Sequence, residues 1–204
     1  NHVWSVGFLL NDLGAFFTPA LYAIEERELI LDLFEAAAGS RMLCNYMRFG
    51  GVVRDVDEDW LTRCRDIVFS RLERKVDELE SYLTHSEILM TRCIGVGLLS
   101  GQDAVALSAC GPMLRGSGVD YDLRRDRPYS IYDRFEFDVV TDDGCDVYAR
   151  YKVRIGEIRQ SIRIVKQALD QIPDGPIFNG KPAYVTRVEK GEAYGAVEGP
   201  KGEL

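Results

Sequence analysis

GPMLRGSGVDYDLRRDRPYSIY, residues 111–132, is the stretch that most constrains the fold. It crowds charged side chains among glycines and aromatic residues, which leaves no room for an ordinary amphipathic helix. The charged residues are Arg115, Asp120, Asp122, Arg124, Arg125, Asp126 and Arg127. Planar guanidinium groups satisfy carboxylates and carbonyls bidentately where water is excluded. We therefore expect a buried seam, in the core or between subunits, with a cradle for a ligand's phosphate as the alternative.

The composition is that of an ordinary folded domain. The 204 residues are 46% hydrophobic and 28% charged, which suits one large domain or one and a half. A net charge of −8 argues against a nucleic-acid partner, because phosphate binding needs a basic surface. No apolar run is long enough to span a membrane, and no signal peptide is expected. Both ends interrupt a pattern, so we expect a piece of a longer polypeptide.

The cysteines and histidines predict no metal site. The five cysteines stand at positions 44, 64, 93, 110 and 145, and none forms a C-x-x-C pair. Reduced thiols are therefore expected rather than disulfides. His2 and His85 lie far apart in sequence, and no cysteine cluster accompanies them.

The N-terminal third predicts two helices. Residues 2–17 are apolar almost all round, which is typical of a buried helix. Thr18 then supplies an N-cap and Pro19 a proline at the first helical position. The second helix runs to about Ala38, and Gly39 is its expected stop.

The middle of the chain predicts a long third helix. Residues 40–56 contain a glycine-rich run that is too short for a helix. Asp57 or Asp59 can cap a helix that ends near Leu83, because its apolar residues recur every three or four positions. A short helix is expected near residues 102–108.

Three patterns organise the C-terminal part. Alternating apolar residues at 135–139 predict a short strand or an extended segment. Residues 151–172 give the strongest helix signal, a heptad-like seam. Its members are Ile155, Ile158, Ile162, Val165, Leu169 and Ile172. Residues 184–188 and 193–197 flank a four-residue turn and predict a β-hairpin.

Basic residues surround this seam on an otherwise acidic chain. They are Arg150, Lys152, Arg154, Arg159, Arg163 and Lys166. A solvated helix face explains them, and so does docking on an acidic partner. The sequence leaves both open.

Asp12 is the sharpest candidate for chemistry. A lone carboxylate in an apolar helix must find a partner or stay protonated, because an unpaired buried charge is costly. Burial raises the pKa of a carboxyl, which suits a proton donor or relay. The alternative is that Asp12 caps or orients a neighbouring loop.

Other candidate motifs are weak. Gly95-Val96-Gly97 lacks the third glycine of a dinucleotide fingerprint, so it predicts a turn before a helix rather than an NAD site. Glu157 and Ser161 lie one helical turn apart, and a structural role beside arginines is expected for them.

An ordered series of motifs resembles a known family. The motifs are Asp12-Leu13-Gly14-Ala15, Thr18-Pro19, Glu26-Arg27-Glu28, Arg48-Phe49-Gly50-Gly51-Val52, Gly111-Pro112-Met113-Leu114-Arg115-Gly116-Ser117-Gly118, Asp122-Leu123-Arg124, Pro128-Tyr129, Gly144, Asp146, Arg150-Tyr151, Arg154, Glu157, Ser161 and Glu198-Gly199-Pro200-Lys201-Gly202-Glu203. Together they resemble the large hydrogenase-like subunit, the 49 kDa or D/H-type subunit, of NADH–quinone oxidoreductase (respiratory complex I). The match spans essentially the whole chain.

The resemblance implies a fold and a site. The expected fold is mainly α (α+β), a helical core of the nickel–iron hydrogenase large-subunit type with a small β-hairpin near the C-terminus. Residues 1–176 would form this core, and residues 177–204 a hairpin segment leading into a further part. Asp12 would partner a histidine near a quinone headgroup as the catalytic and quinone-binding residue. Thr18 would lie near the same pocket.

The resemblance also implies partners. Quinone would be the substrate at a subunit interface, while NAD and the iron–sulfur clusters would be held by other subunits. Those partners would be the terminal iron–sulfur subunit, a neighbouring hydrophilic-arm subunit and the membrane quinone-site subunit. The chain would be peripheral, on the cytoplasmic side of a plasma membrane or the matrix or stroma side of an organelle membrane, and would touch the membrane only through partners. Alone it would be inactive in this proton-translocating enzyme.

The sequence departs from the family pattern at two points, so two other assignments stay open. The usual arginine of the Glu-x-Pro-Arg-Gly-Glu motif is Lys201, which keeps the charge but loses the bidentate fork. The cysteine pairs that hold nickel in hydrogenases have no counterpart here. The large subunit of a membrane-bound nickel–iron hydrogenase is one alternative, and a non-catalytic assembly or scaffold relative is another.

Overall fold

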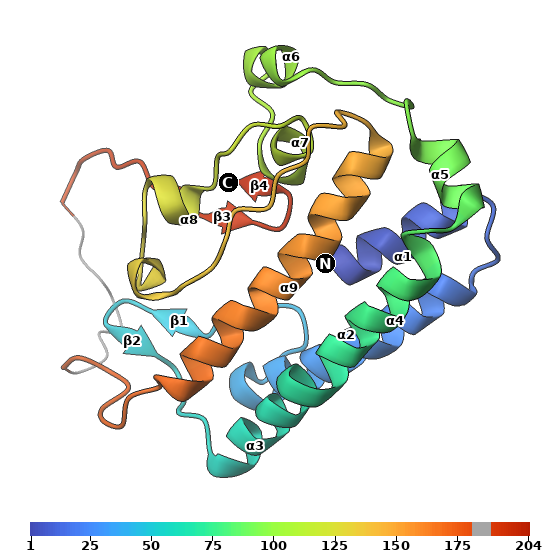
Figure 1. The fold of residues 1–204 in the computed structure, drawn as a ribbon. Helices are drawn as coiled ribbons and strands as arrows, with labels where there is room; N and C mark the ends of the chain where they lie inside the picture. The colour runs from blue at the N-terminus through green and yellow to red at the C-terminus, as the bar shows by residue number, and fades with distance from the viewer. Residues whose placement is uncertain (181–188) are drawn as a thin grey trace.

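The computed structural model describes residues 1–180 and 189–204 and is mainly α-helical (Figure 1). Its helices are α1 (His2–Asp12), α2 (Thr18–Ala38), α3 (Glu58–Asp66), α4 (Glu73–Leu83), α5 (Glu87–Cys93), α6 (Gly101–Ala106), α7 (Gly111–Arg115), α8 (Leu123–Asp126) and α9 (Val147–Asp170), with a π-helical segment η1 (Ile67–Leu72) and a 3-10 turn η2 (Tyr132–Arg134). Two antiparallel pairs join β1 (Met47–Arg48) to β2 (Gly51–Val52) and β3 (Glu198–Gly199) to β4 (Gly202–Glu203). The predicted mainly α fold is confirmed, and a small hairpin near the C-terminus is present at residues other than those predicted.

Helix α9 is the axis of the molecule. Asp146 fixes its start, because its carboxylate accepts a hydrogen bond from the backbone N–H of Ala149 at 2.8 Å. Helices α1, α3, α4, α5 and α7 and the segment η1 all pack against it. The predicted seam is confirmed over most of its length, but Val165 and Ile172 are exposed. The buried residues of this face are Tyr151, Ile155, Ile158, Ile162 and Leu169.

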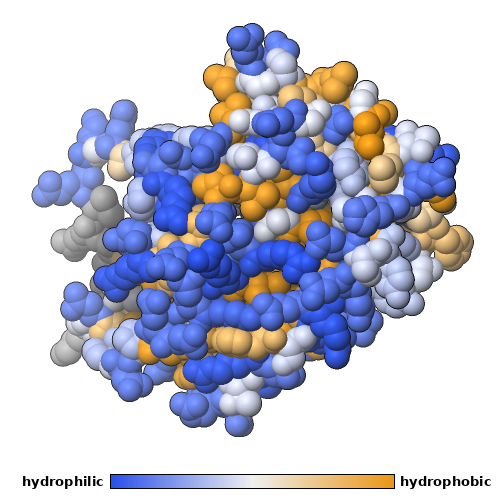
Figure 2. Space-filling view, in the orientation of Figure 1, coloured by the Kyte–Doolittle hydropathy of each residue, from blue (hydrophilic) through white to orange (hydrophobic). Residues whose placement is uncertain are grey.

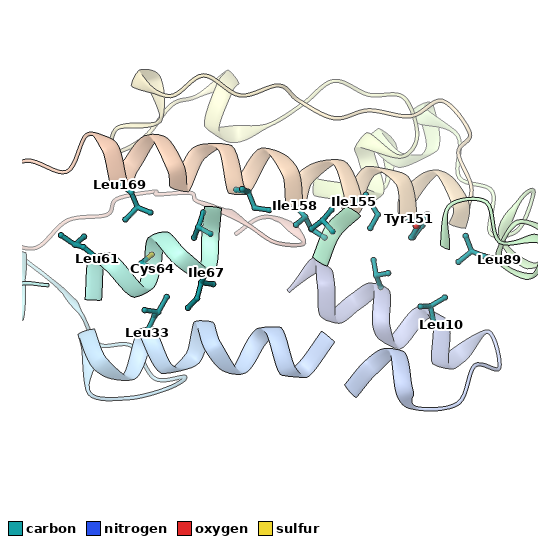
Figure 3. Close-up of a cluster of buried hydrophobic side chains, with 14 of the residues drawn as sticks. Leu10, Leu33, Leu61, Cys64, Ile67, Leu89, Tyr151, Ile155, Ile158 and Leu169 are labelled. Atoms are coloured by element: carbon teal, nitrogen blue, oxygen red, sulfur yellow. The ribbon is translucent and has the colours of Figure 1, made fainter. Parts of the chain in front are cut away.

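The core lies between α9 and the helices beneath it. Figure 3 shows Leu10 of α1, Leu33 of α2 and Cys64 of α3 reaching toward the α9 seam. Each buried leucine or isoleucine side chain stabilises the fold by roughly 1.5–3 kcal/mol relative to its exposed state. The tertiary contacts of these helices, rather than their local propensities, therefore hold the fold together.

Helices α1 and α2 form a tight antiparallel pair. At Gly7, a Cβ atom would lie 3.0 Å from the Cβ of Ala23 and 3.1 Å from the Cα of Ala20, so only small residues allow this approach. The prediction of one buried helix over residues 2–17 is wrong in two respects. Helix α1 ends at Asp12, before Gly14 with its φ of +92°, and Phe16 is 87% exposed. One face of α1 is buried, not the whole helix.

The other predicted helices are found with small shifts. Helix α2 ends as predicted, with Gly39 in the left-handed conformation, but Thr18 is its first helical residue and makes no side-chain cap. Asp57 caps α3 through the N–H of Trp60 at 2.8 Å, as predicted. The long third helix is continuous from 58 to 83, with η1 as its middle segment. The predicted short helix at 102–108 is α6, and α5, α7 and α8 were not predicted.

The extended segment after η2 packs on α9. Phe135 and Phe137 are buried with Ile164, while Glu136 between them is exposed. This alternation matches the predicted extended segment, and no sheet forms there in the described residues.

The predicted C-terminal hairpin is displaced. Residues 184–188 lie outside the described residues, and 193–197 form no strand. The hairpin observed is β3–β4, extended by mutual backbone hydrogen bonds between Val197 and Leu204 at 3.0 and 2.9 Å. It lies against α7, where a Cβ on Gly111, with φ of +62°, would stand 2.4 Å from the carbonyl oxygen of Lys201.

The basic residues around the α9 seam are neutralised within the chain. Arg159 pairs with Asp77 and Glu80, and Lys166 pairs with Glu73 at 2.6 Å. Arg163 pairs with Asp138 at 3.1 Å. These three residues lie on a partly solvated face, as one of the two sequence interpretations predicts, and their counter-charges come from α4 and the extended segment of the same chain. Arg154 differs from them, as described below.

The outer surface is mixed. Figure 2 shows a largely hydrophilic face with apolar residues gathered over α6 and the loop leading to it. Leu98 is 70% exposed there and Leu107 73%. None of the helices in residues 1–180 and 189–204 combines the length and the apolar character that a membrane crossing needs.

Candidate functional site

A cavity of about 370 Å³ lies between α1 and the first turns of α9. We call it the α1–α9 groove. It is lined by Ser5, Val6, Phe8, Leu9, Asp12, Val147, Arg150 and Arg154. Apolar side chains from α1 and α9 form its walls, and one carboxylate and two guanidinium groups border it. An apolar cleft with a few polar groups is the usual character of a small-molecule site.

A second cavity adjoins this groove and belongs to the same face of α1. Its volume is about 720 Å³, and it shares Ser5, Phe8 and Arg154 with the first cavity. Trp4 and Met113 add apolar wall, and the β3–β4 hairpin contributes the exposed Lys201. Phe8 and Arg154 therefore border both spaces.

The loop before α6 holds the start of α9 in place. The N–H of Gly95 donates to the Asp146 carboxylate at 2.8 Å, and the N–H of Val147 donates to the carbonyl of Val96 at 3.0 Å. Arg150 donates to the carbonyl of Gly97 at 2.8 Å. The predicted turn at 95–97 is confirmed, and it ends in the loop that leads to α6. Its role here is to fix the α9 end of the groove.

Arg154 has few partners. One guanidinium N–H donates to the carbonyl of Arg150 at 3.1 Å, and no ion pair of Arg154 occurs within residues 1–180 and 189–204. Burial lowers the pKa of Arg154 from its ordinary value, and the charge of Arg150 lowers it further against the opposing effect of Glu157. The side chain is half-buried, and within the described residues the carbonyl of Arg150 accepts from one of its five N–H donors.

Asp12 is not where the sequence placed it. The prediction of a carboxylate buried inside an apolar helix is wrong for this chain: Asp12 is the last residue of α1, and its side chain is exposed. The physical reason is the early end of the helix, which puts Asp12 at the mouth of the groove. Thr18 is also exposed, at the start of α2, and is not among the residues that line the groove. Only Asp12 of the two predicted site residues borders it.

A second group of charges is buried a short distance away. We call it the Arg115 network. The Nε of Arg115 donates to Glu157 at 2.7 Å, and a terminal nitrogen donates to Glu198 at 3.1 Å. Asp122 lies 3.5 Å from the third nitrogen of Arg115 and accepts two hydrogen bonds from the Arg124 side chain, at 2.9 and 2.7 Å. His2 completes the network, with its Nε2 at 2.6 Å from Glu157. All three guanidinium nitrogens of Arg115 are therefore occupied.

The carboxylates of this network differ in their pKa values. Burial alone would raise the pKa of Glu157, but the His2 hydrogen bond and the Arg115 charge outweigh it and hold that pKa below its ordinary value. Burial dominates at Glu198 and raises its pKa despite Arg115, with the charge of Asp122 acting in the same direction. One carboxyl thus favours the ionised form and the other the neutral form.

The network decides between the interpretations of residues 111–132. Arg115 and Asp122 are 2% and 1% exposed, so the stretch is core architecture within the chain. The prediction that these charges lock the chain to neighbouring subunits is wrong for Arg115 and Asp122, because their partners come from α8, α9 and the β3–β4 hairpin. Arg127 is the exposed exception and pairs with Glu203 at 2.8 Å. Glu157 pairs with an arginine, as predicted.

The remaining candidate chemistry is sparse. All five cysteines are free thiols, with Cys64 and Cys93 buried in the core. Across the described ranges, 1–180 and 189–204, no cluster of three or more histidine, cysteine or acidic side chains could hold a metal ion.

Sequence comparison places the chain among known proteins. The family described as "Respiratory-chain NADH dehydrogenase, 49 Kd subunit" matches residues 12–187. The chain belongs to this family. The match covers the α1–α9 groove from Asp12 onward and the whole of α9, and it confirms the resemblance seen in the motifs.

Curated relatives agree. The chain is 48% identical over 204 residues to the D-type subunit of the NADH-quinone oxidoreductase of Dehalococcoides mccartyi, covering all of this chain and 55% of the relative. It is 47% identical to a D-type subunit of the same enzyme from Herpetosiphon aurantiacus and 42% identical to that of Clostridium beijerinckii, covering 56% and 54% of those proteins. The chain spans about half the length of the curated relatives it matches.

Sequence reasoning missed part of the site. It treated Arg154 as one of several basic residues around a seam, because nothing in the helical pattern separates it from Arg159 or Arg163. The acidic residues that pair with those two lie far away in the chain, so only the fold shows which arginine is left over.

Proposed function

We propose that this chain is a segment of the core subunit that forms the quinone pocket of a proton-translocating NADH–quinone oxidoreductase, and that the α1–α9 groove is one wall of that pocket. Membership of the 49 kDa family supports the enzyme. The observation that carries the site is the groove itself, in which the apolar walls of Val6, Phe8 and Leu9 end at the Asp12 carboxyl. A flat apolar ring with polar oxygens fits such a surface.

Asp12 is the charge or proton partner of the reduced headgroup in this proposal. Reduction of a quinone to a quinol takes up two electrons and two protons, so the site needs a group that delivers a proton to a ring oxygen. A carboxyl at the mouth of the groove is placed to do so, through a histidine supplied outside this chain. Thr18, at the start of the next helix, would lie at the edge of the pocket. A further subunit covering Asp12 would restore the burial that this chain alone does not give it.

The electron carriers belong to other subunits in this proposal. NAD and the iron–sulfur clusters would be held by partners, since no dinucleotide fingerprint occurs in this sequence. The partners would be a terminal iron–sulfur subunit, a neighbouring hydrophilic-arm subunit and a membrane subunit that completes the quinone site. The chain would be peripheral to the membrane, on its cytoplasmic, matrix or stroma side.

The architecture of the whole subunit follows the same proposal. The helical part, residues 1–176, would be a core of the nickel–iron hydrogenase large-subunit type. Residues 177–204, which include the β3–β4 hairpin, would lead into the rest of the subunit.

Substitution of Asp12 in the assembled complex tests the proposal. We expect Asp12→Asn to lower NADH–quinone reductase activity by about 100-fold, because loss of a positioned acid or base costs about 10²–10⁴ in rate. Electron transfer from NADH to a hydrophilic acceptor that bypasses the quinone site is expected to be unchanged. Asp174→Asn, an exposed loop carboxylate, is the matched control. Normal quinone reduction by an assembled Asp12→Asn enzyme would refute the role of Asp12.

A further inference from the structure

Arg154 stands apart from the other arginines of α9. Arg159 and Arg163 each form ion pairs with carboxylates. Arg150 is 7% exposed and donates to the carbonyls of Gly97 and Cys145. Arg154 donates only to the backbone carbonyl of Arg150 in the described part of the chain.

Arg154 lies at a cavity wall, where its remaining N–H donors are available to a ligand. It lines the α1–α9 groove and also the larger cavity beside it, so it borders both spaces. A half-buried cation without a hydrogen-bonded carboxylate is costly to hold, and burial lowers the pKa of Arg154 although the charge of Glu157 acts in the opposite direction. An anion placed in the groove would remove that cost.

The walls restrict which anion fits. Phe8 borders both cavities, and Trp4 lies beside it with the two ring centroids 5.7 Å apart. An inorganic anion would gain nothing from these aromatic faces, whereas an ionised oxygen on a flat ring would gain both contacts. A guanidinium binds such an oxygen by charge-assisted hydrogen bonds.

We propose that Arg154 is the anion-binding side chain of the groove and that it binds the ionised oxygen of a quinol anion. The inference rests on the proposed function, because it takes the quinone as the occupant. A quinone that receives two electrons from a partner's iron–sulfur cluster and one proton becomes a quinol monoanion. Arg154 stabilises that anion until the second proton arrives and completes the quinol. Asp12 and Arg154, which border the same groove, thus have opposite tasks.

Competitive inhibitors of opposite charge state test this assignment in the intact complex. The probes are a long-chain 2-hydroxy-1,4-naphthoquinone, which is ionised at neutral pH, and its neutral 2-methoxy analogue. We expect Arg154→Gln to weaken inhibition by the ionised probe about tenfold, since a charge-assisted hydrogen bond contributes about 1.5–3 kcal/mol. Inhibition by the neutral probe is expected to change by less than about twofold on the same reasoning, because that probe carries no charge for the guanidinium to bind.

Two further variants complete the experiment. Arg154→Lys keeps the charge without the fork, so it is expected to recover part of the affinity for the ionised probe and serves as the readout if Arg154→Gln does not assemble. Arg163→Gln, on the same helix but paired at the surface, is expected to leave both probes unaffected.

The outcomes separate this inference from the proposed function. Equal weakening of both probes by Arg154→Gln or Arg154→Lys, or no weakening of either, would overturn the role of Arg154 while leaving Asp12 untouched. Failure of both probes to compete with quinone in the wild-type complex would instead count against a quinone pocket in this groove, and so against both proposals. Selective loss of the ionised probe supports the inference.

Discussion

The Arg115 network and the α1–α9 groove use the same residue types in opposite ways. In the network, the Arg115 guanidinium contacts three carboxylates, and each nitrogen has an acceptor. In the groove, Arg154 has one backbone acceptor among residues 1–180 and 189–204, and Asp12 is exposed at the edge. Both regions draw on α9, and the network lies deeper in the chain.

The difference shows that the number of partners of a buried charge indicates whether it has a structural or a binding role. A buried charge that is paired with several partners within the chain has few hydrogen-bonding positions left for a ligand. A half-buried charge without a partner keeps its hydrogen-bonding capacity, at a cost to the stability of the chain. The groove is therefore the better candidate for function, although the network is the more conspicuous cluster in the sequence.

Removal of Arg115 is the strongest way to break this comparison. Arg115→Met leaves Glu157, Glu198 and Asp122 without their shared cation, so we expect the free energy of unfolding to fall by about 3–5 kcal/mol. Urea denaturation of the purified chain measures the change. Arg127→Met removes an exposed pair with Glu203 and is expected to change the free energy of unfolding far less, because solvent screens that pair. Similar losses in the two variants would mean that the network does not carry the architecture.

Glu157→Gln is expected to have an intermediate effect that depends on pH. The variant loses its pairs with Arg115 and His2, which we expect to cost about 2–3 kcal/mol at neutral pH. Because the folded pKa lies below the ordinary value of 4.5, the contribution of Glu157 is present above that pH and is lost as the pH falls through the folded pKa. Denaturation from pH 7 down to pH 3 should show the wild type and the variant converging. A constant difference would contradict the lowered pKa.

Glu198→Gln sharpens the comparison within the network and is expected to have the smallest effect of the three network variants. Burial raises the pKa of Glu198 above 4.5, so the fold favours its neutral form, which glutamine resembles. We expect a cost of about 1 kcal/mol at neutral pH.

The pH dependence of the Glu198 contribution has the opposite sign to that of Glu157. The contribution of Glu198 is greatest below 4.5 and declines as the pH rises through the folded pKa. If the wild type and Glu198→Gln instead diverge as the pH rises, Glu198 behaves as a paired carboxylate.

Much of the helical framework could be predicted from sequence alone. Helix α9, the end of α2 at Gly39 and the Asp57 cap depend on residues that are close together in the chain, so periodicity and capping patterns reveal them. Helices α7 and α8, of five and four residues, are too short for a helical period to be recognised, and α5 was missed although it is longer than the predicted α6. The first helix was predicted to be too long, because the sequence stays apolar on both sides of Gly14, where the helical backbone ends.

The candidate site was harder to predict. Asp12 was chosen because it is a carboxylate in an apolar sequence, but its exposure depends on where α1 ends and on how α1 packs against α2. Arg154 was overlooked because every basic residue of α9 looks alike until the positions of its counter-charges are known.

The sequence by itself determined the family, the mainly helical class and the residues that carry chemistry, because motifs and helical periods are local properties of the chain. Only the tertiary structure decided which of those residues form salt bridges and hydrogen bonds within the chain. Pairing depends on side chains that are brought together from distant segments, as Arg115 is with Glu157 and Glu198. Arg154 and Asp12 border the α1–α9 groove because of how the helices pack. The residues next to them in the sequence do not reveal this position.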